Sequence, residues 1–395
     1  MAATVAYEAV VQSIVAVLHG YLWWRFVRDT SRSRRVRRIG AWVAGGLSVM
    51  TSATLIGISA GHLKWLAWPG YVWIGLFFYL LLALVIIELP RWGLSRWWVR
   101  DGRTGRNAVE VGDAAEEPAK SGGVERRLVV ARGAAIVAGL TAAGVTGHGM
   151  RTAFGAPRID RIRIPIGKLP RTMDGTRLAV VSDIHLGPLN GIGHTERITR
   201  VINSVDADVV CVVGDLVDGT VAELGRLAEP LRGIESRRGT YFVTGNHEYY
   251  SGYAPWIEEV AQLGMRPLRN ERVEIDGLDL AGVNDLGGAE FGDPADFGRA
   301  LGDRDTTRPV VLMAHQPAAA VRAAPYGVDL QVSGHTHGGQ MAPVNLVERL
   351  RQPVVSGFGR VDGVPVYVTN GAGFWGPPVR VGAPPQVTVV ELRVA

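Results

Sequence analysis

The chain has 395 residues and a formal net charge of +5, but the two parts of the sequence differ in charge. Residues 1–150 hold 17 Lys and Arg against 9 Asp and Glu, whereas residues 151–395 hold 25 against 28. A net acidic C-terminal part has no general attraction for a phosphate backbone, so we do not expect nucleic-acid binding. The single cysteine, Cys211, lies in an apolar run, can form no internal disulfide, and is expected to be a buried thiol.

Residues 1–150 are predicted to form a transmembrane helical region. Two stretches, 39–61 and 66–88, are apolar over the length needed to cross a bilayer, and two less uniform ones cover 6–24 and 128–147. Nine of the eleven tryptophans precede residue 100, and most of them lie at the ends of these stretches, as in an interfacial aromatic belt. For 6–24 and 128–147 the alternative is a helix that lies in the membrane interface.

The loops between these stretches predict the orientation of the chain. The first loop, 25–38, carries seven arginines, the second only Lys64, and the third, 91–127, eight basic residues. Because basic loops stay in the cytoplasm, 91–127 is expected to be a cytoplasmic linker. Four spans then place the C-terminal domain on the extracytoplasmic face of a bacterial-type cell membrane. If 128–147 does not cross, the domain is cytoplasmic; the pair Arg126-Arg127 also loosely resembles a twin-arginine export signal.

The C-terminal part alternates short apolar runs with polar or helical segments, which predicts an α/β domain. A helix is expected near 194–205, where apolar residues recur at helical spacing. The strongest side-chain chemistry in such a domain lies just beyond the C-terminal ends of strands. Strands are predicted at 177–182, 208–213, 240–244, 278–283, 309–314, 328–333, 364–369 and 386–392.

Nine polar side chains follow five of these predicted strands. Burying so many of them without strong partners would cost several kcal/mol each, so a metal cluster is the economical explanation. Oxygen and imidazole donors without thiolates suit Mn, Fe or Zn, and seven good ligands fit two divalent ions that share a carboxylate. The nine are Asp183, His185, Asp215, Asp218, Asn246, His247, His315, His335 and His337.

These residues stand in five ordered motifs, DIH, GDLVD, GNHE, the lone His315 and GHTH, which resemble those of the calcineurin-like metallophosphoesterases. The longer stretch DLQVSGHTHGGQ is similar to the membrane-associated bacterial branch of that superfamily. The resemblance covers about residues 160–395. It implies a four-layer α/β/β/α sandwich, here assigned to residues 156–395. The all-α transmembrane region of about four helices before it is predicted from the apolar stretches alone.

The resemblance also implies a role for each motif residue. Asp183, His185 and His337 would hold one ion, Asn246, His315 and His335 the other, and Asp215 would bridge both. His247 would stabilise the transition state or protonate the leaving oxygen. Asp218 would orient His247 or its neighbours, with a plain structural hydrogen bond as the alternative.

Three residues outside the motifs are candidate substrate contacts. Asn284 follows a predicted strand, although a simple turn explains it equally well. Trp375 and Arg380 lie in the loop NGAGFWGPPVR, where the tryptophan could contact an apolar part of a substrate and the arginine a phosphate. A structural role for these loop residues is equally open.

The sequence therefore predicts a membrane-anchored phosphoesterase that uses two metal ions and a bridging hydroxide. Its substrate would be a phosphodiester or a lipid-linked phosphate, such as a lipid or cell-envelope component, and its other partner the lipid bilayer. Two alternatives belong to other classes of protein. One is a metal-binding sensor or scaffold without catalysis. The other is a transmembrane receptor or transporter with a phosphoesterase output domain, which ionisable residues within the spans would favour.

Overall fold

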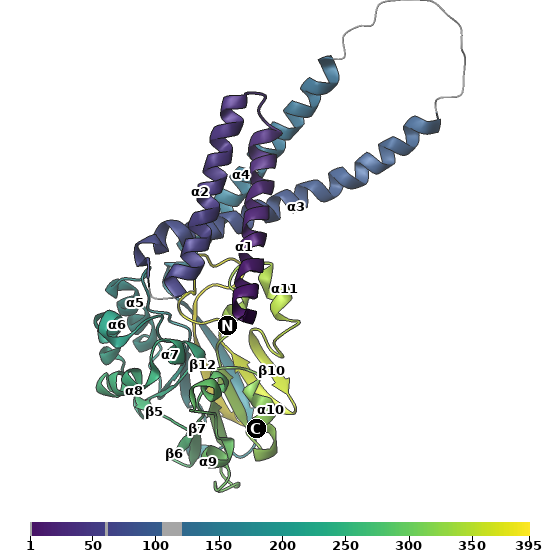
Figure 1. Ribbon diagram of the computed structural model, residues 1–395. Helices are drawn as coiled ribbons and strands as arrows, with labels where there is room; N and C mark the ends of the chain where they lie inside the picture. The colour runs from purple at the N-terminus through teal and green to yellow at the C-terminus, as the bar shows by residue number, and fades with distance from the viewer. Residues whose placement is uncertain (1, 60–61, 105–120) are drawn as a thin grey trace, which may run out of the picture. The chain divides into compact units, whose positions relative to one another are not determined.

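The computed structural model describes residues 2–59, 62–104 and 121–395 (Figure 1). The chain divides into two compact units, Met1–Gly147 and His148–Ala395. The first unit is helical and the second contains all the strands of the described chain.

Four long helices make up the N-terminal unit. Helix α3 continues through much of the segment expected to be a linker, and α4 begins inside it; residues 105–120 of that linker lie outside the described residues. The stretches Glu8–Arg28, Arg34–Ile58, Lys64–Leu89 and Leu128–Ala153 are long and apolar enough to cross a membrane. The helices are α1 (Ala2–Trp23), α2 (Arg34–Ser59), α3 (Ala67–Thr104) and α4 (Ser121–Ala153).

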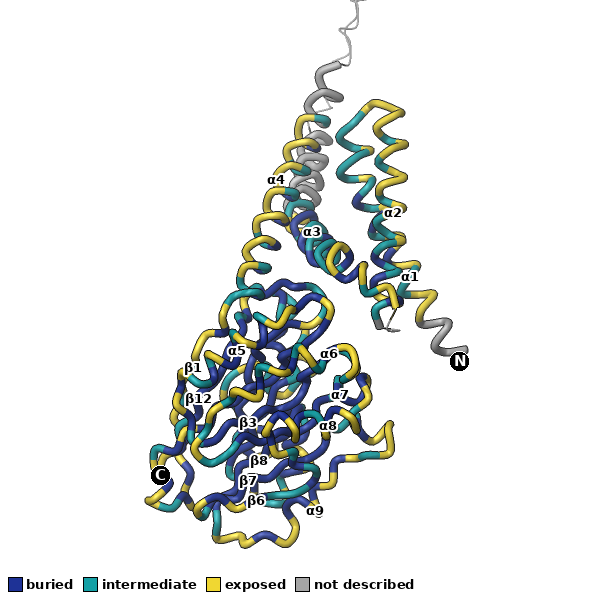
Figure 2. The backbone as a smooth tube through the Cα atoms, turned by 90° about the vertical axis from the view of Figure 1, so that its left-hand side faces the viewer, coloured by how far each residue is buried: buried dark blue, intermediate teal, exposed yellow. Residues whose placement is uncertain are grey.

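Many residues of these helices are exposed, as Figure 2 shows for α2 and α4, and large apolar side chains are among them. Trp42 is 78% exposed and Leu140 is 71% exposed, values that are unusual for large apolar side chains in contact with water. Lipid rather than water is therefore the natural surrounding of these side chains.

Several described polar side chains inside this unit have partners of their own, whereas the Gln12 amide oxygen and the Thr146 hydroxyl are buried without one among the described residues. The His19 ring lies 2.8 Å from the Val15 carbonyl through Nδ1, and its Nε2 accepts a 3.1 Å hydrogen bond from Trp73. Arg25 forms ion pairs with Asp29 and Glu88 near the ends of the apolar stretches. Because these groups are satisfied within the bundle, they resemble structural contacts more than a transport path.

Two six-stranded sheets form the C-terminal unit. All eight strands predicted from the sequence are present. The first sheet has the order β1 (Arg158–Ile166), β12 (Gln386–Val394), β2 (Arg177–Val181), β3 (Val209–Val213), β4 (Thr240–Val243) and β5 (Arg266–Pro267). The second has the order β10 (Gly357–Val361), β11 (Val364–Val368), β9 (Leu330–Ser333), β8 (Val310–Met313), β7 (Leu278–Gly282) and β6 (Glu271–Ile275).

The four strands that the sequence did not predict all lie at or next to the edges of these sheets. Strands β1, β6 and β10 carry charged or exposed side chains on alternate positions, and β5 has only two residues. Edge strands of this kind give a weak hydrophobic signal because only one face of each is buried.

The two sheets pack face to face, and helices cover their outer faces, which confirms the four-layer α/β/β/α arrangement. Apolar side chains of both sheets, such as Val180, Val213, Leu280 and Val332, form one buried cluster between them. Helices α5 (Ile192–Asn203), α6 (Val221–Ala228) and α8 (Tyr253–Gln262) contribute to the cluster on the outside of the first sheet. Helices α9 (Phe297–Leu301) and α10 (Ala319–Ala323) do the same for the second sheet.

The parallel strands bring the predicted site residues to one region of this unit. Strands β2, β3 and β4 run parallel in the first sheet, and β7, β8, β9 and β11 run parallel in the second. The segments that follow β2, β3, β4, β8 and β9 carry the nine predicted residues. Segments far apart in the sequence therefore meet at one edge of the sandwich.

Candidate metal centre

The first group of candidate ligands comes from the segments after β2 and β9. Asp183, His185 and His337 each offer one ligand atom, and these atoms all lie within 4.8 Å of one another. The Nε2 atoms of His185 and His337 are 3.0 Å apart, and Nε2 of His337 is 3.4 Å from a carboxylate oxygen of Asp183. All three side chains are buried.

The second group comes from the segments after β3, β4, β8 and β9. Asp215, His315 and His335 again place one atom each within 4.8 Å of one another. The His335 Nδ1 atom lies 3.1 Å from the amide oxygen of Asn246, which adds a fourth donor. Helix α7 (Asn246–Tyr250) begins at this asparagine.

Asp215 lies between the two groups. Its Oδ2 atom is 3.2 Å from Nε2 of His315 and 3.7 Å from Nε2 of His185. One carboxylate oxygen thus faces donors from both sets, which is the position that a bridging ligand requires.

The backbone at these residues is strained. Five of the seven candidate ligands, Asp183, His185, Asp215, His335 and His337, have φ between 48° and 74°. Side-chain-bearing residues rarely adopt this left-handed region, and conformations of this kind cluster at functional sites where the surrounding structure enforces them. The surrounding structure therefore holds these side chains in a fixed direction at a cost in backbone conformational energy.

Glycines allow the segments to approach one another this closely. A Cβ atom on Gly334 would lie 2.0 Å from the Ser182 hydroxyl and 2.3 Å from an oxygen of Asp183. A Cβ atom on Gly245 would lie 2.2 Å from an oxygen of Asp215. The glycines of the GHTH and GNHE motifs therefore make room for the ligand carboxylates.

The donor set fits a pair of divalent ions. Nδ1 of His315 lies 2.8 Å from the Val213 carbonyl, so this nitrogen carries the proton of the neutral ring, in which Nε2 has a free lone pair. That Nε2 atom is buried and without a hydrogen-bond partner in the described chain. A buried lone pair directed at carboxylates is costly unless a cation lies between them.

Asp218 contacts two histidines at once. One of its carboxylate oxygens lies 2.8 Å from Nδ1 of His185 and 2.8 Å from Nδ1 of His247. An ionised carboxylate can only accept hydrogen bonds, so both Nδ1 atoms carry protons. The Nε2 atom of His185 is then free for a metal ion, and the second histidine ring is held in a fixed orientation.

His247 is set apart from the seven candidate ligands by its surroundings. Burial lowers the pKa of its imidazole, but the carboxylates of Asp215, Asp218 and Glu248 outweigh burial and raise the pKa to about 9. One of its atoms also lies within 4.8 Å of ligand atoms of His185 and Asp215. A protonated imidazole at this place can donate a proton next to the metal centre.

Arg380 does not lie where the sequence-based prediction placed it. The side chain is fully buried, and its guanidinium donates hydrogen bonds to the carbonyls of Gly373, His337 and Ala383. Its Nη2 atom is 3.1 Å from Nδ1 of His337. An arginine enclosed by protein groups cannot reach a substrate phosphate; its contacts instead hold the backbone and ring of His337 in place.

The other two candidate substrate contacts have different positions. Asn284 is buried and bonded to Asp293 and Arg269, so its amide belongs to a structural network. Trp375 is 55% exposed, and its ring centroid lies 5.9 Å from that of His247. Of the three, only Trp375 lies exposed beside a residue of the proposed centre.

The sequence predicts that Glu248 of the GNHE motif supports the ligands rather than binding a metal, whereas it gives Tyr250 no role. Glu248 accepts backbone N–H bonds from Gly245, Asp215 and Leu216. Burial raises the pKa of this carboxyl to about 7. Tyr250, one turn later, is 66% exposed with its ring centroid 5.6 Å from that of His247. The helical spacing from His247 was the only signal for Tyr250 in the sequence.

Comparisons with known proteins agree with this geometry. A family model described as calcineurin-like phosphoesterase matches residues 176–339. An uncharacterized metallophosphoesterase from Aquifex aeolicus is 35% identical over 243 residues, which are 60% of this chain and 92% of that protein. The chain belongs to the calcineurin-like metallophosphoesterases.

Two further relatives extend beyond the region that they share with this member of the family. A transmembrane protein with metallophosphoesterase domain from Danio rerio is 37% identical over 262 residues, covering 63% of this chain and 60% of that one. An uncharacterized metallophosphoesterase from Helicobacter pylori strain J99 is 34% identical over 249 residues, covering 62% and 66%. The chain thus spans less than two thirds of the length of these two curated relatives. The transmembrane relative and the four apolar helices together support membrane association.

Removing the shared carboxylate tests the metal centre directly. Asp215→Asn keeps the side-chain shape but weakens the donor that faces both groups, so we expect the variant to bind about one ion or fewer where the parent chain binds about two. The measurement is elemental analysis of the purified full chain after dialysis against Mn, Fe or Zn. Asp206→Asn, which changes an exposed carboxylate paired with Arg237, is the control. Equal metal content in all three proteins would contradict the bridging position.

Proposed function

We propose that this chain is a membrane-anchored phosphoesterase that works with two divalent metal ions. The observation that carries the proposal is the position of Asp215, one of whose oxygens faces donors of both ligand groups. Asp183, His185 and His337 would hold one ion, and Asn246, His315 and His335 the other. Two ions clamped in this way activate water and neutralise charge on a phosphoryl oxygen.

The residues of this chain supply the geometry and the proton. The left-handed backbone at five of the ligands fixes their direction before substrate arrives. Arg380 donates a hydrogen bond to the backbone carbonyl of His337, and the carboxylate of Glu248 accepts one from the backbone N–H of Asp215. Both contacts hold candidate ligands in place. His247, raised in pKa by its carboxylate neighbours, would donate a proton to the leaving oxygen.

The rim beside His247 indicates the kind of leaving group. Trp375 and Tyr250 are both exposed, and both place their rings next to the His247 ring. Aromatic rings at a site mouth favour a substrate with a planar or apolar part next to the scissile bond. A phosphodiester or a lipid-linked phosphate meets that condition better than inorganic pyrophosphate does.

Metal-dependent hydrolysis is the main test. The full chain in detergent is stripped of metal, reloaded separately with Mn, Fe or Zn, and offered a chromogenic phosphodiester beside the matching monoester. We expect turnover that needs metal, favours the diester, and falls roughly a hundredfold or more in Asp215→Asn. Asp206→Asn should match the parent chain.

The same assay separates the enzyme from the sensor alternative. Two ions bound per folded chain, with no turnover of either ester by any metal form, would support a metal-binding sensor or scaffold. Faster turnover of the monoester than of the diester would support the phosphoesterase proposal but contradict the preference for diesters.

The pH profile of that reaction tests the role of His247. In Asp218→Asn the imidazole loses a carboxylate that raises its pKa, so the pKa falls and the acid form is lost at lower pH. We expect the alkaline limb of kcat/KM to move down by roughly one pH unit. Elemental analysis must show unchanged metal content, because Asp218 also contacts His185. An unmoved alkaline limb at full metal content would exclude this proton donor.

We further propose that the catalytic domain faces the extracytoplasmic side of a bacterial-type membrane. The support is the excess of arginine in loop 25–38 together with four helices of sufficient length. Added protease should digest the C-terminal domain in intact spheroplasts while a cytoplasmic marker protein survives. If the domain is digested only after the cells are lysed, it lies on the cytoplasmic side and the proposed orientation is wrong.

A further inference from the structure

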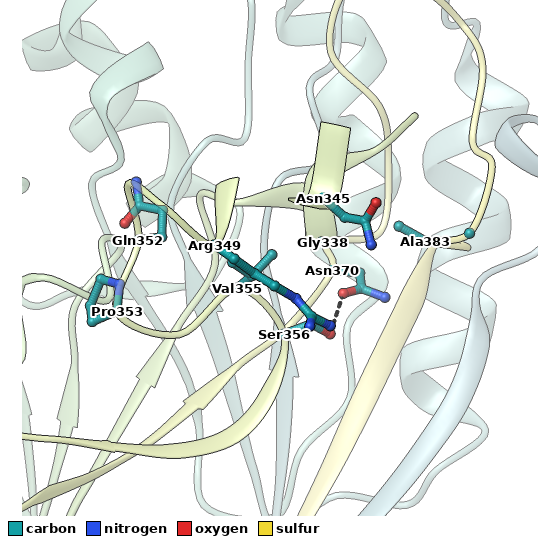
Figure 3. A pocket seen from close by; sticks show the side chains of 10 residues that line it. Gly338, Asn345, Arg349, Gln352, Pro353, Val355, Ser356, Asn370 and Ala383 are labelled. Atoms are coloured by element: carbon teal, nitrogen blue, oxygen red, sulfur yellow. Dashed lines mark hydrogen bonds between the residues drawn. The ribbon is translucent and has the colours of Figure 1, made fainter. Parts of the chain in front are cut away.

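A pocket lies beside the turn that carries His335 and His337 and contains none of the candidate metal ligands. Its volume is about 330 Å³, and its wall includes the backbone at Gly338, which directly follows His337. Figure 3 shows the polar side chains that line it, among them Asn345, Arg349, Gln352, Ser356 and Asn370. A hollow of this volume accommodates a small molecule or a headgroup.

The polar lining of this pocket has unused hydrogen-bonding capacity. Within the described residues, the side chains of Asn345, Arg349 and Gln352 make no hydrogen bond or ion pair. The Ser356 hydroxyl donates a 2.6 Å hydrogen bond to the buried Asn370 amide oxygen, so the floor is already ordered. Figure 3 shows the Arg349 side chain directed toward the side where Ser356 and Asn370 lie.

The charge of the lining selects the ligand. No Asp or Glu belongs to the wall of the pocket, whereas Arg349 contributes a full positive charge. A guanidinium beside amide and hydroxyl groups matches an anionic group with several oxygen atoms, because phosphate oxygens accept the bonds that these groups donate.

The same segment exposes apolar side chains. Helix α11 (Val344–Glu348) and the residues just after it present Leu346, Val347 and Leu350 to solvent, with exposed fractions of 58%, 55% and 87%. Single exposed aliphatic residues are ordinary, but three within five positions, next to Arg349 and Arg351, form an amphipathic edge. A polar, cationic pocket bordered by exposed leucines fits a ligand that has an anionic head and an apolar tail.

The covalent structure of the chain keeps the start of β1 within reach of a bilayer. The last apolar stretch ends at Ala153 and β1 begins at Arg158. The connection between those two residues can extend no further than about 20 Å. The C-terminal unit therefore works beside the membrane that its own helices occupy.

We propose that this pocket binds the headgroup of an anionic phospholipid, with Arg349 on the phosphate and Leu346, Val347 and Leu350 against the acyl chains. The site is separate from the metal centre and does not depend on hydrolysis. Because Gly338 belongs both to the pocket wall and to the turn after His337, a bound lipid would brace the turn that carries the candidate ligands.

A label on the amphipathic edge can detect this contact. The one native cysteine, Cys211, is fully buried and does not compete for a thiol reagent, so Leu350→Cys can be labelled selectively with a fluorophore. The labelled full chain is placed in nanodiscs of phosphatidylcholine that contain a quencher-bearing lipid and increasing amounts of phosphatidylglycerol. Val321→Cys, 51% exposed on α10, is the control position.

We expect quenching at residue 350 to rise with phosphatidylglycerol while quenching at residue 321 does not. Adding Arg349→Ala should raise the mole fraction needed for half-maximal quenching roughly tenfold, the effect of losing one charge-assisted hydrogen bond. Arg299→Ala, an exposed arginine outside the pocket, should leave the curve unchanged.

Three results would overturn the proposal. Quenching that is equal at positions 350 and 321 would show that the edge does not enter the lipid. A curve that Arg349→Ala leaves unmoved would show that the pocket takes no anionic headgroup. Protection of residue 350 that depends on the number of chains per disc, and not on lipid composition, would assign the edge to contacts between copies of this chain.

Discussion

The C-terminal domain is organised around the buried carboxylate of Asp215. The carboxylates near it repel it electrostatically unless a cation lies between them. Its carboxylate shares the interior with Asp183 and Glu248, and burial raises the pKa of both of those groups. Imidazoles of His185 and His315 surround it. Burying several carboxylates together in a medium of low polarity is unfavourable. A positive charge bound at this place would lower that cost.

The protein meets this constraint by ordering its backbone around the ligands. Left-handed residues direct the side chains inward, and Gly334 and Gly245 leave room for carboxylates that any other residue would displace. Arg380, though charged, is buried for the same reason, because its hydrogen bonds fix the strand-following segments that contain His337 and Gly373. The strained backbone, the close glycine contacts and the buried arginine together hold the candidate metal ligands in position before any ligand binds.

The membrane region gives this chemistry a location. His19, Arg25 and Glu88 are paired within the bundle, and its exposed faces are apolar, as expected of helices that serve as an anchor. A short connection ties the catalytic unit to the last of these helices.

The sequence by itself determined which segments are apolar or form strands and which residues are candidate metal ligands. Four apolar stretches, eight strands and the seven candidate ligands are readable because they depend on hydrophobic pattern, strand ends and residue type, all of which are local. The tertiary structure decided the parts that depend on direction and neighbours. Arg380 turned out to be buried behind His337, and Asn284 joined a structural network, because the same loop sequence allows either side of the backbone to face the site. The pocket at Arg349 and the ring of Tyr250 beside His247 exist only once distant segments are packed together, and no periodicity in the sequence records such packing.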